Sequence, residues 1–548
     1  MKKYFPILFL FLIACETKPE TTIDTWFPYD ESSLLAENQG HPSSRMRYKL
    51  IQSTLSDKNE MLHAIEKQLV DFGAVDYARL KPLILEQSIP TIQKYISTSE
   101  LSYKQLVQWY LYRIALYEND SATALNNIIA INTEAVKEAT QKDEDRANDM
   151  QHQIYGMPIF LKDNINAEGF RTTAGAAVLQ DNKTGDAFIT RQLKENGAII
   201  LGKANLSEWA NFLCDGCPNG YSAVGGQTLN PYGPRKFDTG GSSSGSGSTV
   251  AANYAVAAVG TETSGSILSP SSAQSVVGLK PTTGLLSRSG IVPISSTLDT
   301  PGPMTKSVVD NAILLSAMSG YDATDEAMNQ KDQTQKYAEF SEENVLLKMR
   351  FGVITSFLSD SIYALNIEKL RKMGATIVQV DLEDTNLDGF LDLLNADMKR
   401  DLPAYLQHNG DSSLGIKSVN DIVALNISDS AKSIPYGQAR FYGILSDSTS
   451  NEALDSLRVR LNAAGVAYFE QAMEANNLDA FLSINNWSAG YAAAAKYPCI
   501  TVPMGYSGAG EPKGITFIAK PKQEAMLLNM AYHFEQQFSV RLVPLEYN

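Results

Sequence analysis

Short apolar segments alternate with amphipathic ones over most of the chain after Ile154. The apolar segments have the length of buried strands and recur at 157–161, 198–201, 255–259, 350–355 and 375–380. Segments such as 187–196 and 367–373 have the period of a helix instead, and Gly197 and Gly374 follow them as C-caps. This alternation predicts an α/β fold with a central mixed β-sheet flanked by helices.

The chain before Ile154 is dominated by helical periodicity, from about Glu60 to Asp149. In the segment that Ser97-Thr98-Ser99-Glu100 opens, one broad apolar face collects Leu106, Trp109, Tyr110, Ile114 and Leu116. Residues 380–480 carry several further helix-like stretches. Because no break in composition marks a second unit after residue 150, we predict a single large domain over 56–548.

The first residues have the pattern of an export signal. Two lysines precede an apolar run at 4–14 that is too short to span a bilayer as a stable anchor. The run ends in Leu12-Ile13-Ala14-Cys15, which resembles the lipobox of bacterial lipoproteins. The resemblance implies a signal peptide at 1–14, a lipid on Cys15, a polar tether at 15–55 and anchoring to a bacterial envelope membrane. The alternative is an ordinary secretory signal with an incidental cysteine.

Composition narrows the classes of partner and cofactor. The formal net charge of −15 and the absence of a lysine or arginine run disfavour nucleic acid. The five histidines are scattered, and no Gly-Lys-[Ser/Thr] phosphate loop occurs, so we expect neither a metal nor another cofactor. Cys214 and Cys217 form a lone C-x-x-C, which is either a small disulfide or two free thiols, and Cys499 suits the core.

Three residues in two kinds of segment carry the candidate chemistry. Ser242 and Ser266 lie in glycine-rich turns, Gly240-Gly241-Ser242-Ser243-Ser244-Gly245 and Gly260-Thr261-Glu262-Thr263-Ser264-Gly265-Ser266. Lys162 ends the apolar strand predicted at 157–161. A serine needs a base before it attacks a carbonyl, and a lysine in a partly dry site has a pKa low enough to act as that base. These residues predict a serine hydrolase with lysine in place of histidine.

The chain resembles the amidase signature family over most of 100–310, with weaker similarity at 350–385 and better similarity at 480–520. The segments that carry the resemblance, besides the two serine turns, are Gly156-Met157-Pro158-Ile159-Phe160-Leu161-Lys162-Asp163-Asn164, Thr172-Thr173-Ala174-Gly175, Gly202-Lys203-Ala204-Asn205 with Glu208, and Val277-Gly278-Leu279-Lys280-Pro281-Thr282.

The resemblance implies a role for each matching residue. Lys162 corresponds to the catalytic lysine, Ser242 to the bridging serine after a cis peptide bond, and Ser266 to the nucleophile. By the same resemblance, Thr263, Ser264 and Gly265 supply the oxyanion hole together with Ser266 itself, and Ser243 supports the site through hydrogen bonds. Asp163 and Asn164 are expected to be structural.

Four positions depart from the family pattern and concern substrate preference. Glu262 replaces the usual aspartate, Ser264 and Ser244 each replace a glycine, and Leu268 replaces a frequent arginine. The segments that look closest to bacterial peptide amidases are Gly260-Thr261-Glu262-Thr263, Gly225-Gly226-Gln227-Thr228 with Asn230-Pro231, and Leu286 to Ser295. That branch implies hydrolysis of C-terminal carboxamides of peptides with release of ammonia, and no obligate partner chain. The alternative substrates are small aliphatic or aryl amides.

Two other classes of function compete with an amidase. Gly241-Ser242-Ser243-Ser244-Gly245 satisfies the G-x-S-x-G of α/β-hydrolase esterases, with His408 or His533 as the base. That motif requires a strand before it, whereas the turn formers Pro231 to Lys236 precede it here. The other class is an inactive envelope binding protein, which the intact Lys162 and serines disfavour.

Overall fold

The computed structural model describes residues 21–149, 152–328, 337–382 and 385–548, with the backbone alone for 147–149. The signal peptide predicted at 1–14 and the lipidated Cys15 lie outside these residues. Among the described residues, no helix is both long enough and apolar enough to cross a membrane.

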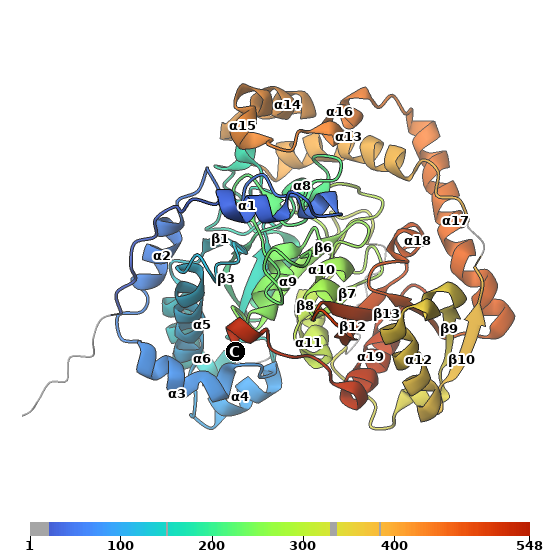
Figure 1. Cartoon of the computed structure of the whole chain (residues 1–548), viewed down its shortest axis with the longest axis horizontal. Coiled ribbons are helices and arrows are strands. Elements are labelled where there is room, and N and C mark those ends of the chain that lie inside the picture. The colour runs from blue at the N-terminus through green and yellow to red at the C-terminus, as the bar shows by residue number, and fades with distance from the viewer. Residues whose placement is uncertain (1–20, 150–151, 329–336, 383–384) are drawn as a thin grey trace, which may run out of the picture.

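Within the described residues, eleven strands form one mixed β-sheet at the centre of the molecule (Figure 1). The sheet contains both parallel and antiparallel pairs: β2 is parallel to β3 and β6, whereas β6 and β8 are antiparallel. In spatial order the strands are β1 (Ile128–Ile131), β3 (Ile199–Ala204), β2 (Pro158–Lys162), β6 (Ala257–Glu262), β8 (Thr300–Thr305), β7 (Val277–Lys280), β12 (Cys499–Tyr506), β13 (Pro512–Ile518), β11 (Ala480–Ile484), β9 (Arg350–Ile354) and β10 (Thr376–Val380).

The strand and helix periodicities after Ile154 predict this part of the fold correctly. All five expected strands are present as β2, β3, β6, β9 and β10. Helix α7 (Phe188–Glu195) is followed by Gly197 at φ +88°, and α12 (Ser361–Met373) ends at Gly374 with φ +108°. The predicted α/β fold with a mixed sheet flanked by helices is therefore confirmed.

Helices cover both faces of the sheet. On one face lie α9 (Ser244–Ala251) and α10 (Leu268–Ala273), which follow the two serine turns directly. On the other lie α11 (Val308–Met318) and α19 (Glu524–Phe538). Side chains of β13 point alternately to the two faces of the sheet. A Cβ on Gly514 would lie 2.6 Å from Ser272 Oγ of α10, whereas the ring centroid of Phe517 lies 5.8 Å from that of Phe534 on α19.

The N-terminal third corrects two of the sequence predictions. Ser97 ends α4 rather than opening the next helix, because Ser102 and Gln105 form the capping box of α5. Leu116 is exposed, while the other four residues of its predicted apolar face are buried. Strand β1 interrupts the predicted run of helices. The helices here are α2 (Lys58–Glu66), α3 (Ala74–Ile84), α4 (Ile89–Ser97), α5 (Tyr103–Glu118) and α6 (Ala135–Asp149).

Residues 21–55, which fall in the predicted tether, pack on the domain. They contain α1 (Ser32–Asn38), and Trp26, Met46, Tyr48 and Ile51 join the main hydrophobic core. The segment is polar on average, but it contains four apolar residues whose burial stabilises the folded state. The rest of the predicted tether, residues 15–20, lies outside the described residues.

A separate helical layer forms from residues 390–476. Its helices are α13 (Phe390–His408), α14 (Val419–Ser428), α15 (Ser430–Ser433), α16 (Ala439–Ser446) and α17 (Asn451–Asn476). Figure 1 shows α13 to α16 in orange above the sheet, with α17 descending along one side. Apolar residues of α13, α14 and α16 form a cluster with the segment that follows β3, where the ring centroids of Trp209 and Phe441 lie 5.2 Å apart. This layer therefore covers the end of the sheet at which β2 and β3 finish.

Candidate active site

The register of two parallel strands brings the lysine to the second serine turn. Ile159 of β2 pairs with Ala257 of β6, and Leu161 pairs with Val259. Lys162 therefore lies beside Gly260 and Thr261, at the edge of the sheet where both strands have their carboxyl ends. Ligand and catalytic groups collect at this edge in open α/β sheets.

Lys162 is fully buried and has three polar neighbours. Its Nζ lies 2.8 Å from Ser242 Oγ, 2.8 Å from Thr261 Oγ1 and 3.2 Å from the Thr261 carbonyl oxygen. Burial lowers the pKa of Lys162 to about 7, although the negative charges of Asp299 and Glu262 oppose the shift. A neutral amine has two hydrogens and one lone pair. The two oxygens of Thr261 can accept these two hydrogens, and the lone pair of the neutral form would then face the Ser242 hydroxyl.

The first serine turn is tied to its surroundings through its backbone. The peptide bond between Gly241 and Ser242 is cis, as the family resemblance predicts. The Ser242 carbonyl accepts a hydrogen bond of 3.0 Å from the Ser207 N–H, and the Ser243 N–H donates to the Ser266 carbonyl over 3.1 Å. The two serine turns are thus joined directly, and they reach the site from α9 and α10.

Ser243 also holds the strand that carries Thr261. Its hydroxyl donates to the Thr261 carbonyl oxygen over 3.0 Å and accepts from the Thr261 N–H over 3.2 Å. The same carbonyl accepts from Lys162. Ser243 and Lys162 therefore share the Thr261 carbonyl oxygen as acceptor, and the supporting role of Ser243 stays a prediction.

Glu262 organises the second serine turn. Its buried carboxylate accepts the Gly265 N–H over 2.7 Å, the Ile267 N–H over 2.7 Å and the Leu268 N–H over 3.0 Å. Gly265 has φ +83°, and a Cβ there would lie 2.8 Å from Asn486 Nδ2, so this position requires glycine. The carboxylate thus folds 262–268 into the turn that presents Ser266, which is 8% exposed.

The candidate oxyanion donors differ in their hydrogen bonds. Among the described residues, no acceptor takes the N–H of Thr263, Ser264 or Ser266. The Gly265 N–H is donated to Glu262, so its place in the oxyanion hole stays a prediction from the resemblance alone. The Thr263 hydroxyl donates to Asp299 over 2.5 Å, and Asp299 also accepts the N–H groups of Ile294 and Ser295. Burial raises the pKa of Asp299.

Asp163 and Asn164 support neighbouring groups. Asp163 forms a fully buried ion pair of 2.9 Å with Lys203 and accepts both the N–H and the hydroxyl of Thr173. Asn164 donates to Thr261 Oγ1 over 3.0 Å, the same oxygen that Lys162 contacts. Asp163 has a structural position, whereas Asn164 acts on the lysine through one intermediate residue.

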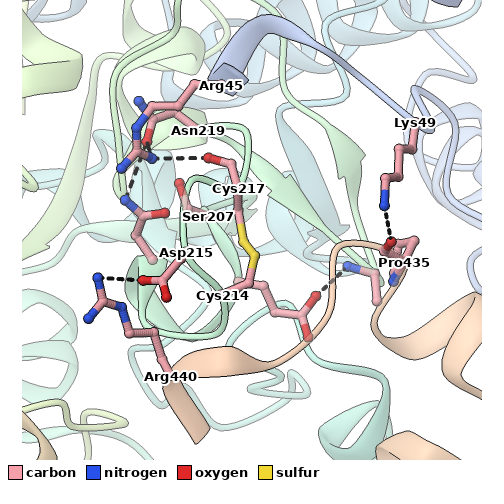
Figure 2. The surroundings of a disulfide bond; sticks show 12 residues. Arg45, Lys49, Ser207, Cys214, Asp215, Cys217, Asn219, Pro435 and Arg440 are labelled. Atoms are coloured by element: carbon pink, nitrogen blue, oxygen red, sulfur yellow. Dashed lines mark hydrogen bonds and ion pairs between the residues drawn. A yellow bond between two sulfur atoms is a disulfide. The ribbon is translucent and has the colours of Figure 1, made fainter. Parts of the chain in front are cut away.

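The cysteine pair next to this site is a disulfide. Cys214 and Cys217 are bonded, with their Cα atoms 5.8 Å apart. Figure 2 shows Arg45 reaching the loop from one side, where it donates to the Cys217 carbonyl over 3.0 Å, and Arg440 from the other, 2.6 Å from Asp215. The disulfide loop follows α8 (Glu208–Asn211). Ser207, immediately before α8, donates its N–H to the Ser242 carbonyl. Cys499 is a free, buried cysteine, as predicted.

The geometry counts against a histidine base. In the described part of the chain, neither His408 nor His533 forms a hydrogen bond to a serine of the two turns. His408 is exposed at the end of α13, and His533 lies on α19, on the face of the sheet opposite α10. Residues 231–236 form turns and no strand, as the sequence indicated. No group of His, Cys, Asp or Glu side chains suited to a metal occurs among the described residues.

Thr261 and Asp299 had no role assigned from the sequence, and Asn164 was expected to be structural. Thr261 and Asn164 contact the lysine or its partner, and Asp299 holds the Thr263 hydroxyl. Thr261 follows a predicted strand that is parallel to the one ending in Lys162, and this placement was the available signal. Asp299 arrives from a loop more than thirty residues away, so no local pattern marks it.

Comparisons with known proteins agree on one family. A family model described as Amidase matches residues 105–432. A probable amidase from Arabidopsis thaliana is 34% identical over 498 residues, covering 87% of this chain and 95% of the plant protein. The crystal structure of an amidase family protein from Bacillus anthracis str. Ames is 35% identical, with a TM-score of 0.86, covering 91% of this chain and 100% of that one. The X-ray structure of native peptide amidase from Stenotrophomonas maltophilia is 34% identical in sequence, with a TM-score of 0.79, covering 84% of this chain and 98% of that one.

The fold and these similarities together define an amide-hydrolysing enzyme. The chain belongs to the amidase signature family, since the family model covers more than half of it and the plant relative is similar over nearly its full length.

Proposed function

We propose that this enzyme cleaves amides through a relay of Lys162, Ser242 and Ser266. The observation that carries the proposal is the 2.8 Å contact between Lys162 Nζ and Ser242 Oγ in a fully buried setting. Neutral Lys162 accepts the Ser242 proton, and Ser242 accepts the Ser266 proton while Ser266 Oγ attacks the carbonyl carbon. The reversed path protonates the leaving amine, and water then releases the acyl group from Ser266.

Backbone donors at the second turn stabilise the negative charge that develops on the carbonyl oxygen. The N–H groups of Thr263, Ser264 and Ser266 have no acceptor among the described residues, which suits donors reserved for a substrate. A single donor of such an oxyanion hole contributes about 10²–10³ in rate. Labelling of Ser266 by a fluorophosphonate, absent from Ser266→Ala, tests the nucleophile and would exclude an inactive scaffold.

The proposed substrates are peptides with a C-terminal carboxamide. The support is the similarity to a peptide amidase over 84% of this chain, together with the segments that look closest to that branch. The test is ammonia release from amidated dipeptides beside simple aliphatic and aryl amides, with Ser266→Ala as the blank. Turnover restricted to peptide amides supports the proposal. A preference for small or aryl amides would keep the relay and overturn the substrate.

We further propose that the protein is exported and held in a bacterial envelope membrane by a lipid on Cys15. The support is the lipobox-like sequence and the Cys214–Cys217 disulfide, because disulfides persist in oxidising compartments. Expression of the full chain with a radiolabelled fatty acid tests it. Label in the wild-type membrane fraction but not in Cys15→Ala supports the anchor. Equal label in both, or none in either, contradicts it.

A further inference from the structure

A polar cavity lies at the end of strand β8 opposite to the second serine turn. It has a volume of about 270 Å³ and is enclosed by the start of α4, the start of α11, β12 and the end of α19. Five charged residues from three segments of the chain line it: Glu86, Lys306, Asp310, Glu535 and Arg541. The chain after α19, red in Figure 1, runs back across this region toward the N-terminal helices.

Strand β8 separates this cavity from the active site. Thr300 at its start pairs with Glu262 of the serine turn, whereas Thr305 at its end pairs with Ala257 and is followed by Lys306. Five steps of about 3.3 Å along a strand place the two ends roughly 17 Å apart. The relay proposed above uses no residue of this cavity, and the proposal made here stands independently of that function.

One ion pair in the cavity is complete by itself. Arg541 lies 2.8 Å from Glu86 and donates its other hydrogens to Tyr232 Oη and to the carbonyl oxygens of Ser275 and Ala251. Glu86 also accepts from Asn253. These two residues therefore close the wall and offer little to an occupant.

The three remaining charged groups keep unused hydrogen-bonding capacity. Asp310 is fully buried, and its Oδ1 accepts the Ile89 N–H over 2.7 Å, but its Oδ2 has no partner among the described residues. In the described part of the chain, Glu535 accepts the Val308 N–H alone, at 3.1 and 3.2 Å. Within the same residues Lys306 donates one hydrogen bond, 3.0 Å to Asn253 Oδ1, although an ammonium group has three hydrogens.

The charges are also unbalanced. Three carboxyl groups and two cations line the cavity, and of the two carboxyl groups outside the complete pair Asp310 is fully buried and Glu535 partly buried. Burial raises the pKa of Asp310 to about 6, although Lys306 opposes the shift, and burial raises the pKa of Glu535 to about 8. Burial likewise lowers the pKa of Lys306 to about 8. For each of the three groups, burial disfavours the ionised form by more than the neighbouring opposite charges favour it.

We propose that this cavity binds a small zwitterion, a free α-amino acid, with its ammonium group on Asp310 and Glu535 and its carboxylate on Lys306. A primary ammonium supplies the donors that Asp310 Oδ2 and Glu535 lack, and a carboxylate accepts the spare hydrogens of Lys306. An ammonium ion alone would leave Lys306 unmatched, and a simple carboxylate would leave Asp310 unmatched. The mixed lining, with Val502 and Pro503 beside the charged groups, accommodates a short aliphatic side chain.

The test is calorimetric titration of the Ser266→Ala protein, which cannot turn over, with L-alanine, ethylamine and propionate. We expect one alanine bound per chain, with ethylamine and propionate roughly tenfold weaker or worse because each lacks one charged contact. Asp310→Asn and Lys306→Met should each weaken alanine binding by a similar factor. Ser316→Ala, at a half-exposed position of α11 whose hydroxyl bonds Ala312, is the matched control and should bind alanine normally.

Three results would overturn the proposal. These are no binding at millimolar alanine, equal binding of ethylamine or propionate, and binding that neither cavity variant weakens, which would place alanine in the active site. If Asp310→Asn fails to fold, as judged by its circular dichroism, Lys306→Met decides the test alone.

Discussion

Thr261 Oγ1 lies 2.8 Å from Lys162 Nζ and 3.0 Å from Asn164 Nδ2, so one threonine hydroxyl joins the buried lysine to the asparagine two residues after it. Together with the Thr261 carbonyl, this hydroxyl fixes where the lysine lone pair points. We predict that Thr261→Val, which keeps the shape, lowers kcat by roughly 10–100-fold with little change in KM. Steady-state kinetics on an amide substrate measures both constants.

The same variant moves the pH profile in a definite direction. Loss of an acceptor destabilises the ammonium form of Lys162, so the acid limb should shift to lower pH. Thr261→Ser keeps the hydroxyl, so its kcat and the pH at which its activity falls should both equal those of the wild type. A Thr261→Val enzyme with an unchanged limb and normal kcat would show that the hydroxyl does not position the lysine.

The pKa of Lys162 predicts the pH dependence of catalysis. Its folded value is lowered from 10.5 to about 7, chiefly by burial, so the lysine is neutral above that pH and protonated below it. Since only the neutral amine accepts a proton, kcat/KM should fall about tenfold per pH unit below about pH 7 and level off above it. Lys162→Ala should lose about 10²–10⁴ in rate and lose this limb. A flat profile through neutral pH in the wild type would contradict the assignment.

We predict that the second serine turn keeps its conformation only while the buried Glu262 carboxylate accepts its backbone N–H groups. Glu262→Gln replaces one acceptor oxygen by an NH₂ group that faces at least one backbone N–H, among Gly265, Ile267 and Leu268. An unsatisfied buried donor costs about 1–3 kcal/mol, and the disordered turn should lower kcat by roughly 10²–10³-fold. Kinetics, the rate of fluorophosphonate labelling and thermal unfolding measure the three effects.

The matched control for this variant is Glu524→Gln on α19. Glu524 is equally buried but accepts a single N–H, that of Thr282. It should keep kcat and the labelling rate. Normal labelling of Glu262→Gln would mean that the turn keeps its shape without the carboxylate.

Periodicity predicted the α/β part of the fold because its strands are short, apolar and bounded by helices capped with glycine. Strand β2 and helix α7 lie within about a residue of their predicted bounds. The tether prediction for 21–55 was wrong over that range, because a few apolar residues such as Trp26 and Tyr48 decide burial while polar residues dominate the composition. Hydrogen bonds of Ser102 and Gln105, which decide where α5 begins, are equally hard to foresee from a run of hydroxyl residues.

For the site, motifs predicted which side chains meet but not what holds them. Lys162 and Ser242 are eighty residues apart and are brought to 2.8 Å, as the resemblance implies. The contact of Thr263 with Asp299 depends on a loop whose path follows from tertiary packing. The charged cavity at Asp310 joins four distant segments, none of which carries a motif.

Asp163 and Lys203 form an ion pair with both side chains fully buried. We predict that Lys203→Met destabilises the protein by about 3–5 kcal/mol, because it leaves the Asp163 charge buried without its counter-ion. The double variant Lys203→Met/Asp163→Leu should recover part of that loss. Urea unfolding of the wild type and both variants measures it. A cost below about 1 kcal/mol for the single variant would mean that the Thr173 hydrogen bonds alone satisfy Asp163.

The disulfide next to the first serine turn should be stabilising but dispensable for catalysis. Crosslinking a loop as short as Cys214–Cys217 contributes about 2 kcal/mol by chain entropy, and the contacts of Arg45 and Arg440 hold the loop in its absence. We therefore expect Cys214→Ser/Cys217→Ser to lower Tm by a few degrees while kcat falls less than about tenfold. Dithiothreitol should lower the wild-type Tm to that of the double variant and leave the double variant unchanged. An equal drop in both proteins would assign the effect to something other than this bond.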